Sequence, residues 1–265
     1  MRESSEAHWT RFWRERADID AVYDTEGRVV EQILAEGDVR GMRALEVGAG
    51  SGRDSVALAE RGARAVVLDY SRASLDVART VAARAGVPLQ LVRADALRLP
   101  FRNGAFDVVF HQGLLEHFRD PMPLLRENAR ALRDGGLLLV DVPQRYHLYT
   151  AAKHVLIGIG KWFAGWETEF TIGELTRLIE RCGLRVTRRY GRWMIPGLFY
   201  RGLRLLLLQS RIARLPLQPP SVPILSPLLA RVRTALAGTP LAFYTYFVIG
   251  AIGRKPGAAA GARGS

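Results

Sequence analysis

A glycine-rich stretch carries the clearest potential for chemistry in this sequence. Residues 46–52 read Glu-Val-Gly-Ala-Gly-Ser-Gly. The apolar residues before them predict a buried strand, and the apolar spacing that begins after Asp54 predicts one face of a helix. Because glycine has no Cβ, the backbone of such a loop can approach a ligand closely and aim N–H groups at it beside a helix N-terminus. The stretch therefore predicts a ligand-binding loop.

The spacing of the glycines argues against a dinucleotide ligand. The dinucleotide fingerprint needs its third glycine three residues after the second, and Arg53 stands there. Glu46 would repel a pyrophosphate, but it could hold an ammonium group directly or through water. The loop therefore favours a cationic or zwitterionic ligand.

Acidic and polar side chains follow three further predicted strands. Asp69 ends the second strand about 20 residues after the first glycine, the spacing at which a carboxylate accepts hydrogen bonds from ribose hydroxyls. The third strand leads to Asp95, and the fourth, 106–110, delivers His111 and Gln112. Parallel strands of an open α/β sheet gather their ligands at the carboxyl edge, so these groups are expected on one rim with the glycine loop.

Six elements resemble a known family in their order and spacing. They are Glu-Val-Gly-Ala-Gly-Ser-Gly at 46–52, Val-Leu-Asp at 67–69, Ala-Asp-Ala at 94–96, Phe-Asp-Val-Val-Phe at 106–110, Leu-Glu-His at 115–117 and Leu-Arg-Asp-Gly-Gly-Leu-Leu-Leu-Val at 132–140. In these the chain is similar to the class I S-adenosylmethionine (SAM) dependent methyltransferases. It most resembles the small-molecule branch that includes the ubiquinone and menaquinone biosynthesis enzymes. The resemblance covers residues 25–145 and 167–190.

The resemblance implies SAM as the cofactor and an enzyme that methylates a small or amphiphilic acceptor. It also implies that Asp95, with Ala96 nearby, contacts the adenine amino group; a turn carboxylate is the less favoured interpretation of Asp95. N-terminal helices of the family form part of a lid, so Trp9, Trp13 and Tyr23 are candidates to line the site. The complete predicted cofactor site comprises Glu46, Gly48, Ala49, Gly50, Gly52, Asp69, Tyr70, Asp95, Ala96, His111 and Gln112.

The predicted acceptor side holds few candidates for catalysis. Methyl transfer from a sulfonium is an in-line displacement, so the protein mainly positions donor and acceptor and excludes water, and a base is needed only where the acceptor must lose a proton. His117, Tyr146 and His147 are the acceptor-side candidates. For His117 two interpretations stay open: a general base, or a group that orients or packs. One cysteine and five histidines without zinc-site spacing predict no metal.

Composition places the chain in a reducing compartment. Cys182 is the only cysteine among 265 residues, and the first residues lack the apolar region of a signal peptide. The longest uncharged apolar run, 241–252, is too short for a membrane-spanning helix. These features predict a cytoplasmic protein without a membrane span.

The excess of positive over negative charge lies entirely in the second half of the chain. The net charge is +12; residues 1–145 carry 21 Arg or Lys against 22 Asp or Glu, whereas residues 146–265 carry 17 against 4. No acid follows Glu180. The second half should therefore attract anions whatever its fold.

Two inserts depart from the family pattern. Residues 146–166 are amphipathic, and residues 191–240 combine prolines with a leucine-rich stretch, 198–215, whose arginines are spaced along one flank of a helix. Interfacial membrane helices show this pattern, and anionic headgroups add about 1 kcal/mol per surface Arg or Lys. Three interpretations stay open for the second insert. It contacts lipid at the inner face of the membrane, it forms a cap whose leucines pack on the core, or, least favoured, it contacts nucleic acid.

The predicted fold is α/β. We expect a doubly wound, mostly parallel, seven-stranded Rossmann-like sheet, with helical inserts after strand 5 and between strands 6 and 7, and with the seventh strand inside 243–252. The expected parts are N-terminal helices or lid (1–36), SAM-binding core (37–145), amphipathic insert (146–166), core continuation (167–190), basic hydrophobic insert or cap (191–240), last core strand (241–255) and disordered tail (256–265).

Two other functions stay open at this point. RNA methylation is motivated by the basic second half, but neither a recognisable RNA-binding module nor an exposed stacking platform accompanies it. A SAM-binding or membrane-associated protein without turnover would also keep the glycine loop, Asp69 and Asp95. The leading interpretation is a SAM-dependent methyltransferase with a small or lipid-like acceptor.

Overall fold

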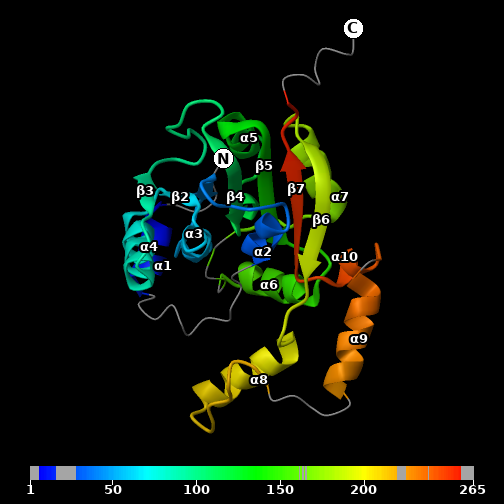
Figure 1. The fold of residues 1–265 in the computed structure, drawn as a ribbon. Helices are drawn as coiled ribbons and strands as arrows, with labels where there is room; N and C mark the ends of the chain where they lie inside the picture. The colour runs from blue at the N-terminus through cyan, green and yellow to red at the C-terminus, as the bar shows by residue number, and fades with distance from the viewer. Residues whose placement is uncertain are drawn as a thin grey trace.

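The computed structural model describes residues 6–15, 28–160, 162, 164, 166–219, 225–237 and 239–257. Its centre is a seven-stranded sheet in the order β3-β2-β1-β4-β5-β7-β6 (Figure 1). The strands are β1 (Arg43–Val47), β2 (Arg64–Asp69), β3 (Gln90–Arg93), β4 (Phe106–Gln112), β5 (Leu132–Pro143), β6 (Arg185–Arg192) and β7 (Val248–Arg254). Neighbours pair in parallel, except that β7 runs antiparallel to both β5 and β6. The predicted mostly parallel sheet is confirmed.

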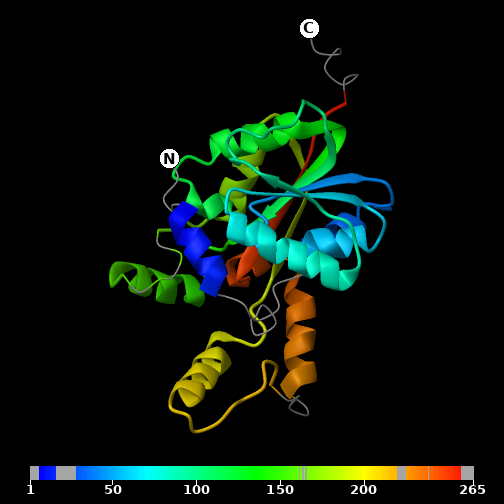
Figure 2. The same cartoon turned by 90° about the vertical axis from the view of Figure 1, so that its left-hand side faces the viewer.

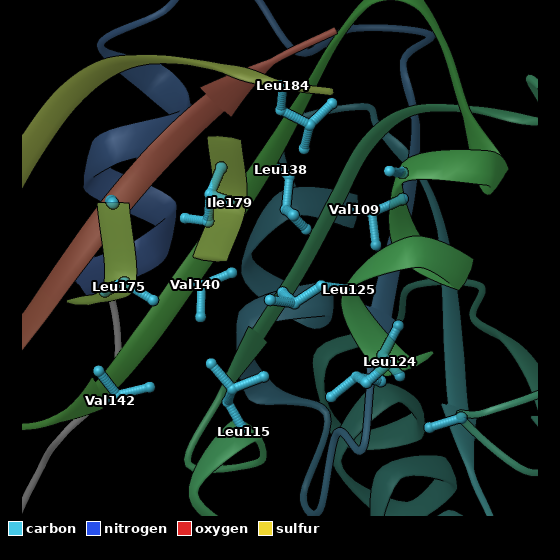
Figure 3. Close-up of a cluster of buried hydrophobic side chains, with 14 of the residues drawn as sticks. Val109, Leu115, Leu124, Leu125, Leu138, Val140, Val142, Leu175, Ile179 and Leu184 are labelled. Atoms are coloured by element: carbon cyan, nitrogen blue, oxygen red, sulfur yellow. The ribbon is translucent and has the colours of Figure 1, made fainter. Parts of the chain in front are cut away.

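Helices cover both faces of this sheet. One face carries α2 (Arg28–Leu34), α3 (Arg53–Ala59) and α4 (Arg72–Ala85), and the other carries α5 (Met122–Ala131) and α7 (Ile172–Glu180). Successive strand residues point to opposite faces, so Val108 of β4 packs with α2 and α3 whereas Val109 packs with α5 and α7. Figure 3 shows the second cluster, in which Leu125 and Ile179 lie against Leu138 of β5.

Local sequence signals set most helix ends. The Ser71 hydroxyl accepts the Ser74 N–H at the start of α4, and Gly86 ends that helix in a left-handed conformation, φ 68°. A capping box of Thr171 and Glu174 opens α7. The loops after β1, β2 and β4 meet at the carboxyl edge of the sheet, next to the starts of these helices.

Asp134-Gly135-Gly136 in the sequence predicts a glycine stop for a helix over 123–132, and this prediction is wrong. The helix ends at Ala131, and β5 begins directly at Leu132. The Gly135 N–H donates to the Lys255 carbonyl, and the Lys255 N–H donates to the Gly136 carbonyl, each at 2.9 Å. These glycines therefore pair with the chain that leaves β7 and do not cap a helix.

The predicted seventh strand is also shifted. Residues 242–245 form the short helix α10 (Ala242–Thr245), and β7 runs from Val248 to Arg254. Tyr246, between them, packs on the Trp193 ring with 4.6 Å between centroids. The aromatic residues before β7 are therefore not part of the strand, and Tyr246 joins the end of the preceding insert to its beginning at Trp193.

That insert, residues 193–247, forms what we call the arm. It leaves the sheet at the end of β6, on the carboxyl edge of the parallel strands, and its helices α8 (Leu198–Gln209) and α9 (Leu225–Ala237) extend away from the body in both views (Figures 1 and 2). The helix predicted over 198–215 ends at Gln209, because Arg211 has a left-handed φ of 58° and irregular chain follows. The prolines around 216–227 concealed α9, although proline is tolerated in a first helical turn.

The first insert contains α6 (Leu148–Gly158). This helix buries a charged side chain and exposes apolar ones, the reverse of an ordinary amphipathic helix on a protein core. Lys153 is buried at 1% exposure, whereas Leu148, Val155 and Ile159 are exposed. Lys161 and Phe163, also assigned to this amphipathic segment, lie outside the described residues. Within the described ranges, no helix is long and apolar enough to cross a bilayer.

Candidate cofactor and acceptor site

A cavity of about 440 Å³ lies at the carboxyl edge of the parallel strands. The loops after β1, β2 and β4, the start of β7 and residues of α6 line it, together with two tryptophans of α1 (Glu6–Glu15). Small-molecule sites typically have volumes of ~300–1,000 Å³. The cavity has the size and position of a small-molecule site in an open α/β sheet.

The glycine loop forms one wall of the cavity. Gly48 and Gly50 have φ of 64° and 56°, which glycine adopts readily and other residues do not. A Cβ on Gly48 would lie 2.7 Å from Leu114 Cδ1, and one on Gly50 would collide with the Trp13 ring. Ala49 also lines the wall. Gly52 is absent from it; this glycine caps α3 and packs against Ala78 of α4.

Glu46 is a buried acid directly below this loop. Its Oε2 accepts the Ser55 hydroxyl at 2.6 Å and the Ser55 N–H at 3.1 Å. Burial, followed by the charge of Asp54, raises the pKa of Glu46 to about 8. Because Glu46 lines the cavity, a cation bound there would favour its ionised form.

Asp69 connects the loop to the end of β2. Its Oδ2 accepts the Ser74 hydroxyl at 2.8 Å and the Gly50 N–H at 3.3 Å, and its Oδ1 accepts the Ser71 N–H at 2.8 Å. Burial raises the pKa of Asp69, and these hydrogen bonds only partly offset the rise. Asp69 also lines the cavity, so its carboxylate faces a ligand bound there.

An arginine that the sequence analysis missed completes this half of the cavity. Arg28 Nε donates to Asp141 Oδ2 at 3.2 Å, and Arg28 Nη2 donates to Gln112 Oε1 at 3.0 Å. Gln112 Nε2 in turn donates to Asp54. The charge of Arg28 opposes the rise that burial produces in the pKa of Asp141. No motif marks Arg28, because it lies in a stretch that reads only as the cover of the sheet.

The predicted adenine contacts are placed only in part. Tyr70 and Ala96 line the cavity. Asp95 is exposed and outside the cavity lining, and its Oδ1 accepts the Leu97 N–H at 3.0 Å. Its side chain therefore behaves as the turn carboxylate of the alternative interpretation.

His111 is buried in the sheet and does not line the cavity. Burial lowers its pKa to about 3, and neither ring nitrogen has a partner among the residues described. The next residue, Gln112, points to the opposite face and does line the cavity. Both His111 and Gln112 were expected in the site, but successive side chains of a strand point to opposite faces of the sheet, so only one of them can line the cavity.

The other half of the cavity contains ionisable and aromatic side chains. Glu116 and His117 come from the single turn after β4 at Leu115–His117, and Tyr149 and Lys153 come from α6. Glu167 follows from the segment before α7. Burial lowers the pKa of His117, so its imidazole is neutral near pH 7.

Lys153 holds α6 to the segment before α7. Its Nζ lies 2.8 Å from Glu167 Oε2 and 2.7 Å from Glu169 Oε1. Glu167 Oε1 accepts the Trp162 indole N–H at 2.9 Å, and Glu169 Oε2 lies 2.8 Å from His154 Nε2. We call the group of Lys153, Glu167 and Glu169 the latch. The latch explains why α6 buries a charged residue: Lys153 must lie inside to pair with Glu167 and Glu169.

Two acceptor-side candidates lie outside the cavity. Tyr146 is exposed and stacks on Tyr244 of α10, with 5.9 Å between centroids. His147 caps α6, where its Nδ1 accepts the Tyr149 N–H at 3.1 Å. Of the three predicted acceptor-side residues, the structure brings only His117 to the cavity lining.

Helix α1 stands over the glycine loop. Trp13 packs on Gly50, and Trp9 meets the His117 ring edge to face with 5.1 Å between centroids. Both tryptophans line the cavity as expected. Tyr23, the third aromatic residue considered for this role, lies outside the described residues.

A family of known proteins matches the part of the chain that forms this site. The family model described as "Methyltransferase domain" matches residues 45–140, which include the glycine loop, Asp69 and the turn with Glu116. The chain is a SAM-dependent methyltransferase. One relative, the ubiquinone biosynthesis O-methyltransferase of Neisseria meningitidis serogroup C (strain 053442), is 28% identical over 190 residues, covering 68% of this chain and 79% of its own. The corresponding protein of Parvibaculum lavamentivorans is 30% identical, covering 57% and 61%.

Solved structures confirm the methyltransferase fold. A SAM-dependent methyltransferase from Thermotoga maritima aligns with a TM-score of 0.59 at 17% identity, covering 95% of this chain and 100% of its own. Magnesium protoporphyrin IX methyltransferase from Synechocystis PCC 6803, with S-adenosylhomocysteine (SAH) bound, aligns with a TM-score of 0.56 at 13% identity, covering 94% and 84%. Across the described part of this methyltransferase, no group of three His, Cys, Asp or Glu side chains is placed to hold a metal ion.

Proposed function

We propose that this methyltransferase transfers the methyl group of SAM to a hydroxyl oxygen of an amphiphilic acceptor, which it meets at a membrane surface. The oxygen follows from the names of its relatives, which are O-methyltransferases. The membrane follows from the arm. The cofactor and acceptor halves of the cavity supply the remaining support.

The cofactor half fits SAM, which supplies an electrophilic methyl group on a sulfonium. Glu46 is a buried acid without a counter-cation bonded to it, as a ligand ammonium requires. Arg28 has five N–H donors and uses two toward the described residues, so it can hold a ligand carboxylate. Asp69 takes a ribose hydroxyl, and Ala96 packs on the adenine. The glycines between them let the ligand approach the backbone.

The acceptor half fits a neutral ring with a hydroxyl group. Tyr149, Trp162 and Phe247 give it aromatic walls. The charge of Lys153 is balanced by two carboxylates, so Lys153 is not available to bind an anionic acceptor. The start of β7 borders the cavity and continues from the base of the arm, which places the acceptor half next to it.

The exposed apolar surface of the arm carries the membrane proposal. No residue of α8 is buried, and Phe199 is 85% exposed, Ile212 75% and Leu206 61%. The leucines therefore do not pack on the core, as the cap interpretation required. Exposed apolar patches mark interaction sites, and the sequence has no acid after Glu180 to repel an anionic surface. The exposed face of α6 lies on the same side of the molecule (Figure 1).

Co-sedimentation with vesicles tests this proposal. The wild-type protein should bind phosphatidylcholine vesicles that contain phosphatidylglycerol, and should bind pure phosphatidylcholine more weakly. Burying one Phe or Leu contributes about 1.5–3 kcal/mol, so the double variant Phe199→Ser with Leu206→Ser should bind at least about tenfold more weakly. Leu34→Ser, a change at an exposed leucine of α2, is the control and should bind as wild type.

Two results would contradict the membrane proposal. One is equal binding of the double variant and the wild type. The other is salt-sensitive binding to RNA without binding to vesicles, which would favour a nucleic-acid partner for the arm.

A further inference from the structure

Glu116 is a buried acid of the acceptor half that the proposed function has not yet used. It lies in the turn after β4, is 4% exposed and lines the cavity. Its Oε2 has no hydrogen-bond partner among the residues that the structure describes. A buried polar atom without a partner costs free energy, so a carboxyl group kept in this state at a cavity wall points to a ligand that completes it.

The backbone holds this carboxyl group in place. The Glu116 carbonyl accepts the Thr168 N–H at 2.9 Å, which fixes the turn to the segment before α7. A Cβ built on Gly113 would lie 3.6 Å from Glu116 Oε1, so the carboxyl lies against the loop that leaves β4. The position of Glu116 is therefore set by the sheet edge and not by an ion pair.

No neighbouring group neutralises or replaces Glu116. Lys153 is engaged by Glu167 and Glu169, and both Glu167 oxygens are taken by Lys153 and Trp162. His117, the adjacent residue, has a pKa lowered by burial, which makes its imidazole a weaker base. Asp141, the other cavity carboxylate that acts on Glu116, is paired with Arg28, so Glu116 is the carboxylate without a cationic partner at this end of the described cavity lining.

We propose that Glu116 takes the proton of the acceptor hydroxyl during methyl transfer. This inference rests on the proposed function. The acceptor oxygen forms the bond to the methyl carbon while the sulfur–methyl bond breaks and its electron pair stays on sulfur. The O–H electron pair stays on the acceptor oxygen, and the proton moves to Glu116. The products are a methyl ether, a thioether and a protonated carboxyl group, so charge and atoms balance.

The electrostatic setting suits this role near neutral pH. Burial, followed by the charge of Glu167, raises the pKa of Glu116 to about 8, so its carboxylate is a stronger base than an exposed one. The ionisable groups that act on it are Glu167 from the segment before α7, Lys153 from α6 and Asp141 from β5. His117 lies in its own turn, and His8 of α1 acts on His117. The rate should rise with pH up to about 8, because only the ionised form accepts a proton.

The test compares two acceptors that differ in how readily they ionise. The probes are 4-octylcatechol, whose hydroxyls are neutral at neutral pH, and 4-nitrocatechol, which ionises far more easily. General-base catalysis typically contributes ~10²–10⁴-fold, so Glu116→Gln should lower kcat for 4-octylcatechol at least about 100-fold and kcat for 4-nitrocatechol less than about tenfold. SAH affinity should stay unchanged, and Glu116→Asp should restore part of the lost rate.

One control variant and one independent readout complete the test. Glu180→Gln, at an exposed acid of α7, should behave as wild type with both probes. In Glu116→Gln the rise of the rate toward pH 8 should disappear. Equal losses with both probes, or no loss with either, would overturn the proposal.

Carbon-13 NMR titration of the glutamate carboxyls separates this proposal from the proposed function. The signal that is missing in Glu116→Gln identifies Glu116, and it should titrate well above the exposed glutamates. Titration in the ordinary range of an exposed glutamate would overturn the role of Glu116, whether or not either probe is methylated. Failure to methylate both probes, with the raised titration intact, would instead count against the proposed acceptor class.

Discussion

Replacing Lys153 by methionine is expected to lower the free energy of unfolding by about 3–5 kcal/mol. The change removes the cation of the latch and leaves Glu167 and Glu169, both buried, without their counter-charge. Breaking a buried ion pair on one side is costly because the remaining charge must either stay unpaired or take up a proton. Native domains are stable by only about 5–15 kcal/mol, so the loss should be large and easily measured.

The magnitude follows from which charges remain. In the triple variant Lys153→Met, Glu167→Gln and Glu169→Gln, the neutral amides still accept hydrogen bonds from Trp162 and His154 but carry no charge. This variant should therefore recover at least about 2 kcal/mol relative to Lys153→Met alone. A matched surface change, Arg79→Ala, breaks the exposed pair with Asp76 and should alter stability by less than about 1 kcal/mol.

Urea unfolding at two pH values provides the assay. In Lys153→Met the unpaired carboxyls bind protons more tightly in the folded than in the unfolded state, so stability falls as pH rises above their unfolded pKa. The deficit relative to wild type should therefore be larger at about pH 8 than at about pH 5. A triple variant no more stable than Lys153→Met, or a deficit independent of pH, would refute the electrostatic account of the latch.

Two further predictions concern the cofactor half. Glu46, whose pKa is raised to about 8, should lose its proton when a ligand ammonium binds, so SAH affinity should increase with pH up to about 8. Calorimetry at pH 7 in buffers of different ionisation enthalpy should show release of about 0.5–1 proton on binding. Binding of SAH without proton release would contradict this. Gly48→Ala places a Cβ 2.7 Å from Leu114 Cδ1 at positive φ and should weaken SAH binding at least about tenfold, whereas Gly86→Ala, at similar φ with open space around it, should cost about 1 kcal/mol of stability and leave SAH affinity unchanged.

The order of the elements was predictable because local signals agree with the sheet. The glycine loop, Ser71 and the capping box at Thr171 each specify a turn or helix start through their own hydrogen bonds. Long apolar runs specified the central strands. The shifted β7 was not predictable, since Tyr246 leaves the strand pattern to pack on Trp193, a contact made across the whole arm.

The site was predictable where it depends on backbone position, and less so where it depends on side-chain direction. Glu46 and Asp69 lie in the last residues of β1 and β2, so the strand ends locate them. His111 and Asp95 also follow or end strands, but their side chains do not join the cavity lining. Arg28 and the latch are joined across long stretches of sequence, and no spacing rule connects them to the glycine loop.

Calorimetric titration with SAH, on wild type and on Asp69→Ala, tests the central claim most directly. The account predicts binding of one SAH at micromolar affinity by the wild type, and binding at least about tenfold weaker by a folded Asp69→Ala variant, because a lost hydrogen bond to a charged group costs about 1.5–3 kcal/mol. No binding of SAH by the wild type would contradict the assignment of this cavity as the cofactor site. Undiminished binding by Asp69→Ala would remove its ribose contact.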